Sequence, residues 1–134
     1  MAAEIFVQRF PVAAGDIDEL GHVNNIVYLR YAQDIATAHW RARAAAEDVR
    51  AVVWVVARHE VDYRAPLELG DQVEVRTWVD DAPRGATWAR FIEVAKQGQD
   101  KPAAQIKSTW VLLDADTRRP RRVTQEMAAP FLAG

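Results

Sequence analysis

The chain has 134 residues, 50% of them hydrophobic and 27% charged, with no cysteine and a formal net charge of −2. This length fits one compact domain over residues 1–134, and the composition is that of a folded globular protein, which excludes a disordered chain. A nucleic-acid binder usually carries a strongly basic face, so the near balance of charge argues against that class. Without cysteine there is no disulfide, no thiol nucleophile and no thiolate metal site.

No targeting or membrane segment is recognisable in the sequence. The first ten residues lack the basic and apolar regions of a signal peptide, and no stretch reaches about 18 uncharged apolar residues in a row. We therefore expect a cytoplasmic protein with no membrane contact, in the reducing compartment that the absence of cysteine indicates.

The first elements are a strand and a long helix. Apolar residues predict a strand over residues 4–12, and a polar loop follows it. From Asn25 to about Glu47, apolar residues recur every three or four positions, which predicts an amphipathic helix. Ala32 and Ala36 lie on its inner face, where small side chains let a helix pack closely on a sheet.

The remainder of the chain reads as strands joined by turns. Runs with strand character cover residues 51–66, 72–81, 86–96 and 103–113. Short links predict antiparallel neighbours, the first run is long enough to be bent or bulged, and Thr124 can begin a short terminal helix through Leu132. One strand, one long helix and four further strands predict the α+β class, with the helix packed on a five-stranded, mainly antiparallel sheet.

The apolar segment over residues 52–56 bears on assembly. An apolar strand at an open sheet edge invites aggregation, and natural proteins pair or cover such edges. We therefore expect subunits to pair edge to edge, as a homodimer or a higher assembly.

The polar loop before the helix concentrates the residues that could carry chemistry. Asp16, Asp18, His22, Asn24 and Asn25 crowd into about ten residues that end at a helix N-terminus. Unpaired backbone N–H groups at such an end carry partial positive charge, so the loop could hold and polarise a carbonyl.

The loop has two simpler interpretations. The spacing D-x-D-x-x-G matches the start of a calcium loop, but the fifth and twelfth positions are Leu20 and Val27, so two ligands are missing and calcium is excluded. A helix cap accounts for Asn24 or Asn25. It accounts less well for the histidine, the second aspartate and the glycines of the loop.

A larger pattern connects the loop to a known family. The motif D-x-D-x-x-G-H-V-N-N-x-x-Y is met at every fixed position, by Asp16, Asp18, Gly21, His22, Val23, Asn24, Asn25 and Tyr28. With VDYRAPLELGD at residues 61–71 and the tail over residues 110–123, it resembles the hotdog-fold acyl-CoA thioesterases of the 4-hydroxybenzoyl-CoA thioesterase superfamily, over nearly the whole chain.

The resemblance implies a fold, a reaction and partners. The fold would be the hotdog fold, and the reaction the hydrolysis of an acyl or aroyl thioester of coenzyme A or acyl carrier protein to a free acid and a thiol, with no metal and no cofactor. With the pairing expected at the sheet edge, our hypothesis is a homodimer or homotetramer that hydrolyses the thioester at a subunit interface. Hotdog folds host several chemistries, so a 3-hydroxyacyl or enoyl thioester dehydratase or hydratase and a non-catalytic acyl-CoA-binding domain stay open as alternatives.

The same resemblance implies roles for the loop residues. Asp18 corresponds to the catalytic carboxylate, acting as nucleophile or as general base, and a carboxylate is ionised at neutral pH. The backbone N–H of Asn25 would stabilise the oxyanion. Gly21, Asn24 and Tyr28 would lie against the substrate.

Two residues of the loop need separate interpretation. The loop resembles that of plant acyl-carrier-protein thioesterases, in which an acid, an asparagine and a histidine work together, and this favours a substrate-positioning role for His22. The matching asparagine position is Leu20 here, and His22 could equally fix the loop through hydrogen bonds. Asp16 is expected to structure the loop rather than to act as a second catalyst.

The basic tail could contact the nucleotide of coenzyme A. Guanidinium groups suit phosphate oxygens, so Arg118, Arg119 and Arg121 could grip it, and Lys96 and Lys107 compete for the same task. The alternative is a solvated turn after the last strand.

Other candidates are weaker. His39 and His59 have no metal-ligand spacing and are expected to be hydrogen-bonded structural residues, while Glu47 or Glu60 could replace the loop acid as base. Four tryptophans are expected in the core or an interface rather than along an acyl tunnel: Trp54, Trp78, Trp88 and Trp110.

Overall fold

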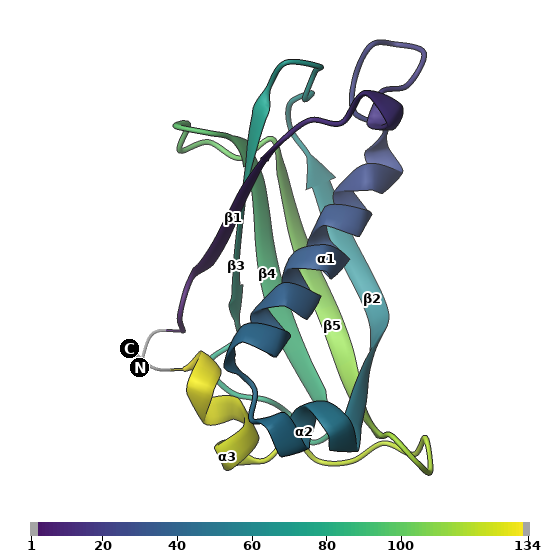
Figure 1. Ribbon diagram of the computed structural model, residues 1–134, viewed down its shortest axis with the longest axis vertical. Helices are drawn as coiled ribbons and strands as arrows, with labels where there is room; N and C mark the ends of the chain where they lie inside the picture. Colours follow the sequence, from purple (N-terminus) through teal and green to yellow (C-terminus); the bar gives the residue numbers. More distant parts are fainter. Residues whose placement is uncertain (1–2, 133–134) are drawn as a thin grey trace.

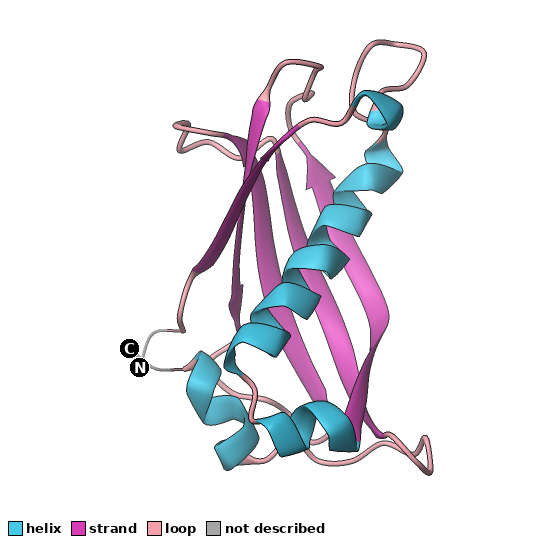
Figure 2. Cartoon of the chain, viewed as in Figure 1, coloured by secondary structure: helices cyan, strands magenta, loops and turns pink. Residues whose placement is uncertain are grey.

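The computed structural model describes residues 3–132 and consists of a curved sheet with a long helix across it (Figure 1). Its helices and strands are β1 (Phe6–Pro11), α1 (Asn25–Arg43), α2 (Ala46–Ala51), β2 (Val52–Tyr63), β3 (Gln72–Val79), β4 (Thr87–Lys96), β5 (Ala104–Asp114) and α3 (Gln125–Ala128). Short 3₁₀ turns cover Ala14–Asp16 and Ala129–Phe131. The α+β class and the helix on one face of a five-stranded sheet are confirmed (Figure 2).

The strand order of the sheet is β1-β3-β4-β5-β2, with every pair antiparallel. Short turns make β3, β4 and β5 neighbours, as predicted from the links between them. Strand β2 is different, because it pairs with β5 at the far edge and not with β3, which follows it in the chain. The bulge predicted in this strand is present, since the pairing register shifts between Val56 and Arg58.

Helix α1 ends earlier than its sequence pattern predicts. The prediction of a helix to about Glu47 is wrong, because Ala44 adopts an extended conformation with ψ 147° and a separate helix α2 follows. The physical reason is the position of β2. After α1 the chain must turn to reach the far edge of the sheet, and α2 makes that connection below the end of α1 (Figure 1).

The helix packs against the concave face of the sheet through its small and apolar residues. Ala32 is 1% exposed and Ala36 is 7% exposed, as predicted for a close approach. Beside them Ile35 is 1% exposed, and burying a side chain of this size contributes roughly 1.5–3 kcal/mol. The core divides into two clusters, one around Tyr28 and Tyr31 and the other around Phe131.

The two ends of the sheet have different coverings. The loop between β1 and α1 lies at one end, called the loop end, together with the start of α1 (Figure 1). Helices α2 and α3 close the other end, called the α2 end. Thr124 caps α3, as predicted, by accepting a hydrogen bond from the Met127 N–H at 3.1 Å. Over residues 3–132, no helix combines the length and the apolar character needed to cross a bilayer.

Candidate active site

The polar loop is a short hairpin fixed at its base. Ile17 and Val23 form an antiparallel bridge, and the Val23 N–H donates to the carbonyl of Leu67 at 2.8 Å. Between them the chain turns tightly, with the Gly21 N–H donating to the carbonyl of Asp18 at 3.0 Å. Gly21 has a φ of 82°, a conformation that strains any residue with a Cβ, so the turn requires glycine here.

The carboxylate of Asp18 is held by the backbone of its own turn. Oδ1 accepts hydrogen bonds from the N–H groups of Leu20 at 2.9 Å and His22 at 3.3 Å. Oδ2 makes no hydrogen bond to the residues that the structure describes, and the side chain is partly exposed. One oxygen therefore fixes the orientation of the carboxylate while the other faces outward.

Asp16 structures the loop, as predicted, through a partner that the sequence did not indicate. Both of its carboxylate oxygens accept from the guanidinium of Arg30 one turn into α1, at 2.9 and 2.5 Å. Its backbone carbonyl also accepts from the Asn24 N–H at 2.9 Å. The Arg30 hydrogen bonds hold the pKa of Asp16 below its ordinary value, so this carboxyl stays ionised and tied to the helix.

The start of α1 presents unpaired donors beside the loop. Asn24 is the N-cap, and its side chain accepts from the Ile26 N–H at 3.2 Å. Asn25 is the first helical residue and is exposed, and its N–H makes no hydrogen bond within residues 3–132. Its carbonyl accepts from the hydroxyl of Tyr63 at 2.9 Å, which ties the helix start to the end of β2.

The other loop candidates lie in different environments. The ring of His22 is partly exposed and makes no hydrogen bond to the described residues, while its backbone carbonyl accepts from the Asp18 N–H at 2.8 Å. The ring of Tyr28 is 2% exposed and packs edge-on against Tyr31 and Tyr63. In a single chain Tyr28 therefore supports the loop from the core, and substrate contact by it stays a prediction.

The arginines of the tail lie far from this loop within one chain. Arg118, Arg119 and Arg121 belong to the turn after β5, at the α2 end of the molecule (Figure 1). They are exposed, and Arg121 pairs with Asp114 at 3.4 Å. One protomer does not bring them to Asp18, so a role in binding coenzyme A stays a prediction that needs a second subunit.

The two acids considered as alternative bases, and the two histidines outside the loop, lie elsewhere in the fold. Glu47 lies on α2, and Glu60 is exposed on β2 beside Arg58, so neither belongs to the loop. His39 is fully buried and hydrogen-bonded through both ring nitrogens, which confirms its structural role. His59 is only half satisfied, since Nδ1 lies 2.7 Å from Ser108 Oγ while its buried Nε2 has no partner among the described residues.

A pocket under the C-terminal half of α1 was not predicted. It has a volume of about 320 Å³, and its lining is mostly aromatic and aliphatic. The main lining residues are Trp40, Trp54, Val79, Trp88, Arg90, Trp110 and Phe131. Three of the four predicted core tryptophans thus face a cavity, while Trp78 lies on the other face of the sheet, stacked on Phe91. The signal that could have found the pocket is the number of tryptophans on helix-facing strand positions.

Comparison with known proteins relates the whole chain to thioesterases. A family model described as the acyl-ACP thioesterase N-terminal domain matches residues 3–131. An uncharacterised protein of Mycobacterium tuberculosis is 26% identical over 127 residues, which are 95% of this chain and 49% of that protein. The chloroplastic oleoyl-acyl carrier protein thioesterase of Coriandrum sativum is 30% identical over 82 residues, 60% of this chain and 22% of that protein. The chain thus spans half the length of these relatives or less.

Solved structures give the same fold. A Thermus thermophilus thioesterase solved with coenzyme A and zinc has a TM-score of 0.82 and 27% identity, covering 98% of this chain and 100% of that one. The 12:0-ACP thioesterase of Umbellularia californica has a TM-score of 0.77 and 19% identity, covering 94% of this chain and 52% of that one. These likenesses confirm the hotdog fold.

Within residues 3–132, no three His, Asp or Glu side chains gather as a metal site would require.

Proposed function

Because the chain belongs to the family of the acyl-ACP thioesterase N-terminal domain, we propose that it hydrolyses acyl thioesters with Asp18 as the catalytic carboxylate. The observation that carries this proposal is the state of that carboxylate. One oxygen is fixed by two backbone N–H groups of the turn, and the other is free on an exposed loop at a helix start. The likeness to a Thermus thermophilus thioesterase, over 98% of this chain and 100% of that one, supports the reaction class.

The free oxygen of Asp18 can act in either of two ways. As a nucleophile, Oδ2 attacks the thioester carbonyl carbon, forming a mixed anhydride and releasing the thiolate, and water then cleaves the anhydride to the free acid. As a general base, it removes a proton from water that attacks the same carbon. The fixed Oδ1 suits both routes, because it keeps the carboxylate in one orientation.

The start of α1 supplies the complementary charge. The unpaired N–H of Asn25 points out of a helix N-terminus, where the helix dipole favours a developing negative charge. We assign this N–H to the oxyanion of the tetrahedral intermediate, and a donor of this kind typically contributes about 10²–10³ in turnover. His22 would position the substrate, and Gly21 and Asn24 would line its path along the loop.

A second copy of the chain completes the proposed site. Within residues 3–132, strand β2 pairs with β5 alone, and its other edge is open. Two copies joined through β2 in antiparallel fashion would place the loop end of one beside the α2 end of the other. This homodimer, or a tetramer built from it, would bring the tail arginines of one copy toward the Asp18 loop of its neighbour, where they could bind the phosphates of coenzyme A.

The test measures thiol release from acyl-CoA and acyl carrier protein thioesters of several chain lengths, including an aroyl-CoA. Asp18→Asn keeps an acceptor for the two N–H groups of the turn, so it should fold normally and lose at least about 10² in turnover. Glu19→Gln is the matched control, because it removes an exposed carboxylate from the same turn. Unchanged turnover in Asp18→Asn would refute the assignment of this residue.

The same assay separates the alternative functions. No thiol release together with tight acyl-CoA binding would indicate a binding domain. An absorbance change with an enoyl-CoA and no thiol release would indicate a hydratase. Either result would overturn the proposal.

A further inference from the structure

Arg90 is a buried arginine without a carboxylate partner. It lies on β4, is 7% exposed, and forms no ion pair within the described residues. Its Nη1 donates to Nδ1 of His39 at 2.9 Å and to the hydroxyl of Thr77 at 3.1 Å. Burial lowers the pKa of Arg90 to about 10, which leaves the guanidinium charged at neutral pH.

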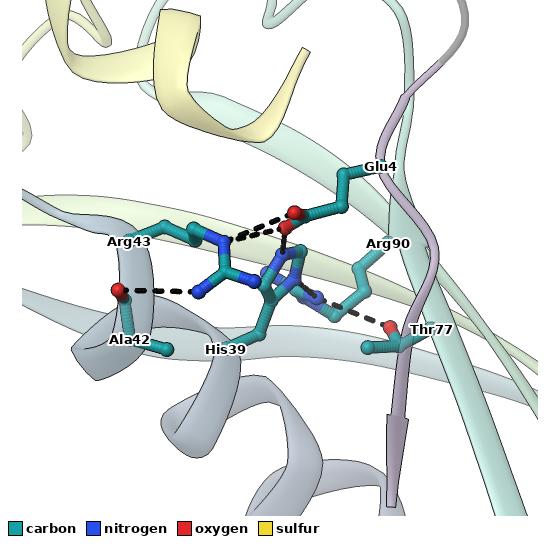
Figure 3. Close-up of polar contacts among 6 residues, drawn as sticks. All are labelled: Glu4, His39, Ala42, Arg43, Thr77 and Arg90. Atoms are coloured by element: carbon teal, nitrogen blue, oxygen red, sulfur yellow. Dashed lines mark hydrogen bonds and ion pairs between the residues drawn. The ribbon is translucent and has the colours of Figure 1, made fainter. Parts of the chain in front are cut away.

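The acid of this hydrogen-bond network, Glu4, is occupied by other groups. Glu4 accepts from His39 Nε2 at 2.8 Å and from Arg43 Nε at 2.9 Å, and His39 stands between this carboxylate and Arg90 (Figure 3). His39 therefore carries its proton on Nε2 and accepts at Nδ1. The ion pair of Glu4 is with Arg43, so the charge of Arg90 has no direct counterion in the network.

The pocket under α1 runs from an exposed rim to this guanidinium. Thr37, Arg41 and Val49 lie on its rim and are exposed. Trp88, Arg90 and Phe131 form its inner part, where each is at most 7% exposed. The guanidinium of Arg90 thus lies at the inner end of a cavity whose walls are mostly apolar, with Thr37 and Arg41 at the rim.

Donors without partners also border this cavity. Nε and Nη2 of Arg90 make no hydrogen bond within residues 3–132. Buried donors are nearly always satisfied in folded proteins, so these groups are expected to meet acceptors from a ligand or from water.

We propose that this pocket receives the acyl group of the substrate and selects acyl groups that end in a carboxylate, which Arg90 binds at the inner end. The inference rests on the proposed thioesterase function and names its substrate class. In the antiparallel dimer described above, the Asp18 loop of one copy lies toward the pocket of the other. The thioester would then sit at the rim and the terminal carboxylate inside.

Size and desolvation favour a short carboxyacyl group. A volume of about 320 Å³ is at the lower end of the roughly 300–1,000 Å³ of small-molecule pockets. The fold already removes most of the Arg90 surface from water, so a carboxylate that pairs with it adds little further desolvation of the guanidinium. Guanidinium groups also accommodate carboxylates through two parallel hydrogen bonds, and Arg90 has two free nitrogens.

The test compares hexanoyl-CoA with adipoyl-CoA, which have the same chain length and differ by the terminal carboxylate. The wild-type protein should prefer adipoyl-CoA by about 10- to 100-fold in kcat/KM, the range expected for a charged hydrogen bond. Arg90→Met should abolish or reverse this preference, and Arg90→Lys should retain part of it. Arg43→Met is the matched control, because it removes an arginine of the same network that does not line the pocket.

A binding measurement keeps this inference separate from the proposed reaction. Calorimetry on Asp18→Asn should give tighter binding of adipoyl-CoA than of hexanoyl-CoA, and this comparison needs neither turnover nor a folded Arg90 variant. Equal affinities there, or a wild-type preference that survives in Arg90→Met, would overturn the inference. Failure to hydrolyse either thioester, combined with tighter binding of adipoyl-CoA, would instead refute the thioesterase function and leave the pocket assignment standing.

Discussion

The ring of His39 receives a hydrogen bond from Arg90 at Nδ1, and the two groups are 2.9 Å apart inside the core. Burial and the neighbouring guanidinium lower the pKa of His39 from 6.5 to about 4. A protonated ring would lose its acceptor and face a positive charge. The pair therefore persists only while the histidine is neutral.

This pair predicts a loss of stability on acidification. The unfolded chain binds a proton at His39 below pH 6.5 and the folded chain only near pH 4, so the free energy of unfolding falls between these values. We expect a loss of about 2 kcal/mol between pH 7 and pH 5 from this group, measured by urea unfolding. His39→Gln should weaken this dependence of the free energy of unfolding on pH. Any dependence that remains in the variant would come from His59, whose burial also lowers its pKa.

The conformation of the Asp18 turn predicts that alanine substitution has different effects at two nearby glycines. Gly21 has a φ of 82°, whereas Gly15 has no positive φ, and an added Cβ meets no atom within 4 Å at either position. Gly21→Ala should therefore lower the free energy of unfolding by roughly 1–2 kcal/mol through backbone strain alone. It should also reduce thioester turnover, because Asp18 belongs to the same turn. Gly15→Ala should leave the melting temperature and turnover nearly unchanged. Equal behaviour of the two variants would contradict this account of the turn.

The ion pair between Arg30 and Asp16 is expected to matter for activity more than for stability. Half of the Arg30 side chain is exposed, so Arg30→Met should change the free energy of unfolding by less than about 1 kcal/mol. A small displacement of the Asp18 loop, which we propose to be catalytic, can lower kcat/KM by up to about 10². Carbon NMR should report a raised pKa for Asp16 in this variant. Arg50→Met, on α2, is the control for loss of a helix arginine.

The loop was predictable from sequence because its residues are close together in the chain. Asp18, Gly21 and Asn25 fall within one short segment, and their spacing carries the turn, the cap and the resemblance. The bidentate partner of Asp16 was not predicted, since Arg30 reads as one more polar residue on the outer face of a helix. Local pattern was sufficient for most elements of the fold, but not for the break between α1 and α2 or for the order of the strands.

The pocket was not predictable, because its residues meet only through the strand order. Trp54 and Trp110 come from strands far apart in sequence that pair because β2 crosses to the far edge. That crossing depends on the break after Arg43, in a stretch of alanines with no glycine or proline to mark it. Arg90 alternates with apolar residues on β4, as an outward arginine would, and only the structure places it under α1.

The open edge of β2 predicts how two copies meet. Val55 on β2 is 42% exposed, and Val7 on β1, the opposite edge strand, is 37% exposed. Val7 is therefore a suitable control position for Val55. The chain has no cysteine, so single-cysteine variants report contacts without background. Under mild oxidation, Val55→Cys or Arg58→Cys should give disulfide-linked dimers, because antiparallel pairing brings residues near the two-fold axis within the roughly 4.4–6.8 Å that a disulfide spans between Cα atoms.

Val7→Cys should stay uncrosslinked, since β1 lies at the opposite edge of the sheet. Sedimentation of the unmodified protein supplies the independent measurement, and we expect a dimer or a tetramer. If β2 is the interface, crosslinking through this strand should leave thioester turnover intact, because the loop of each copy already faces the pocket of the other. A monomer in solution, or crosslinking through Val7→Cys alone, would show that the active site is not completed across β2.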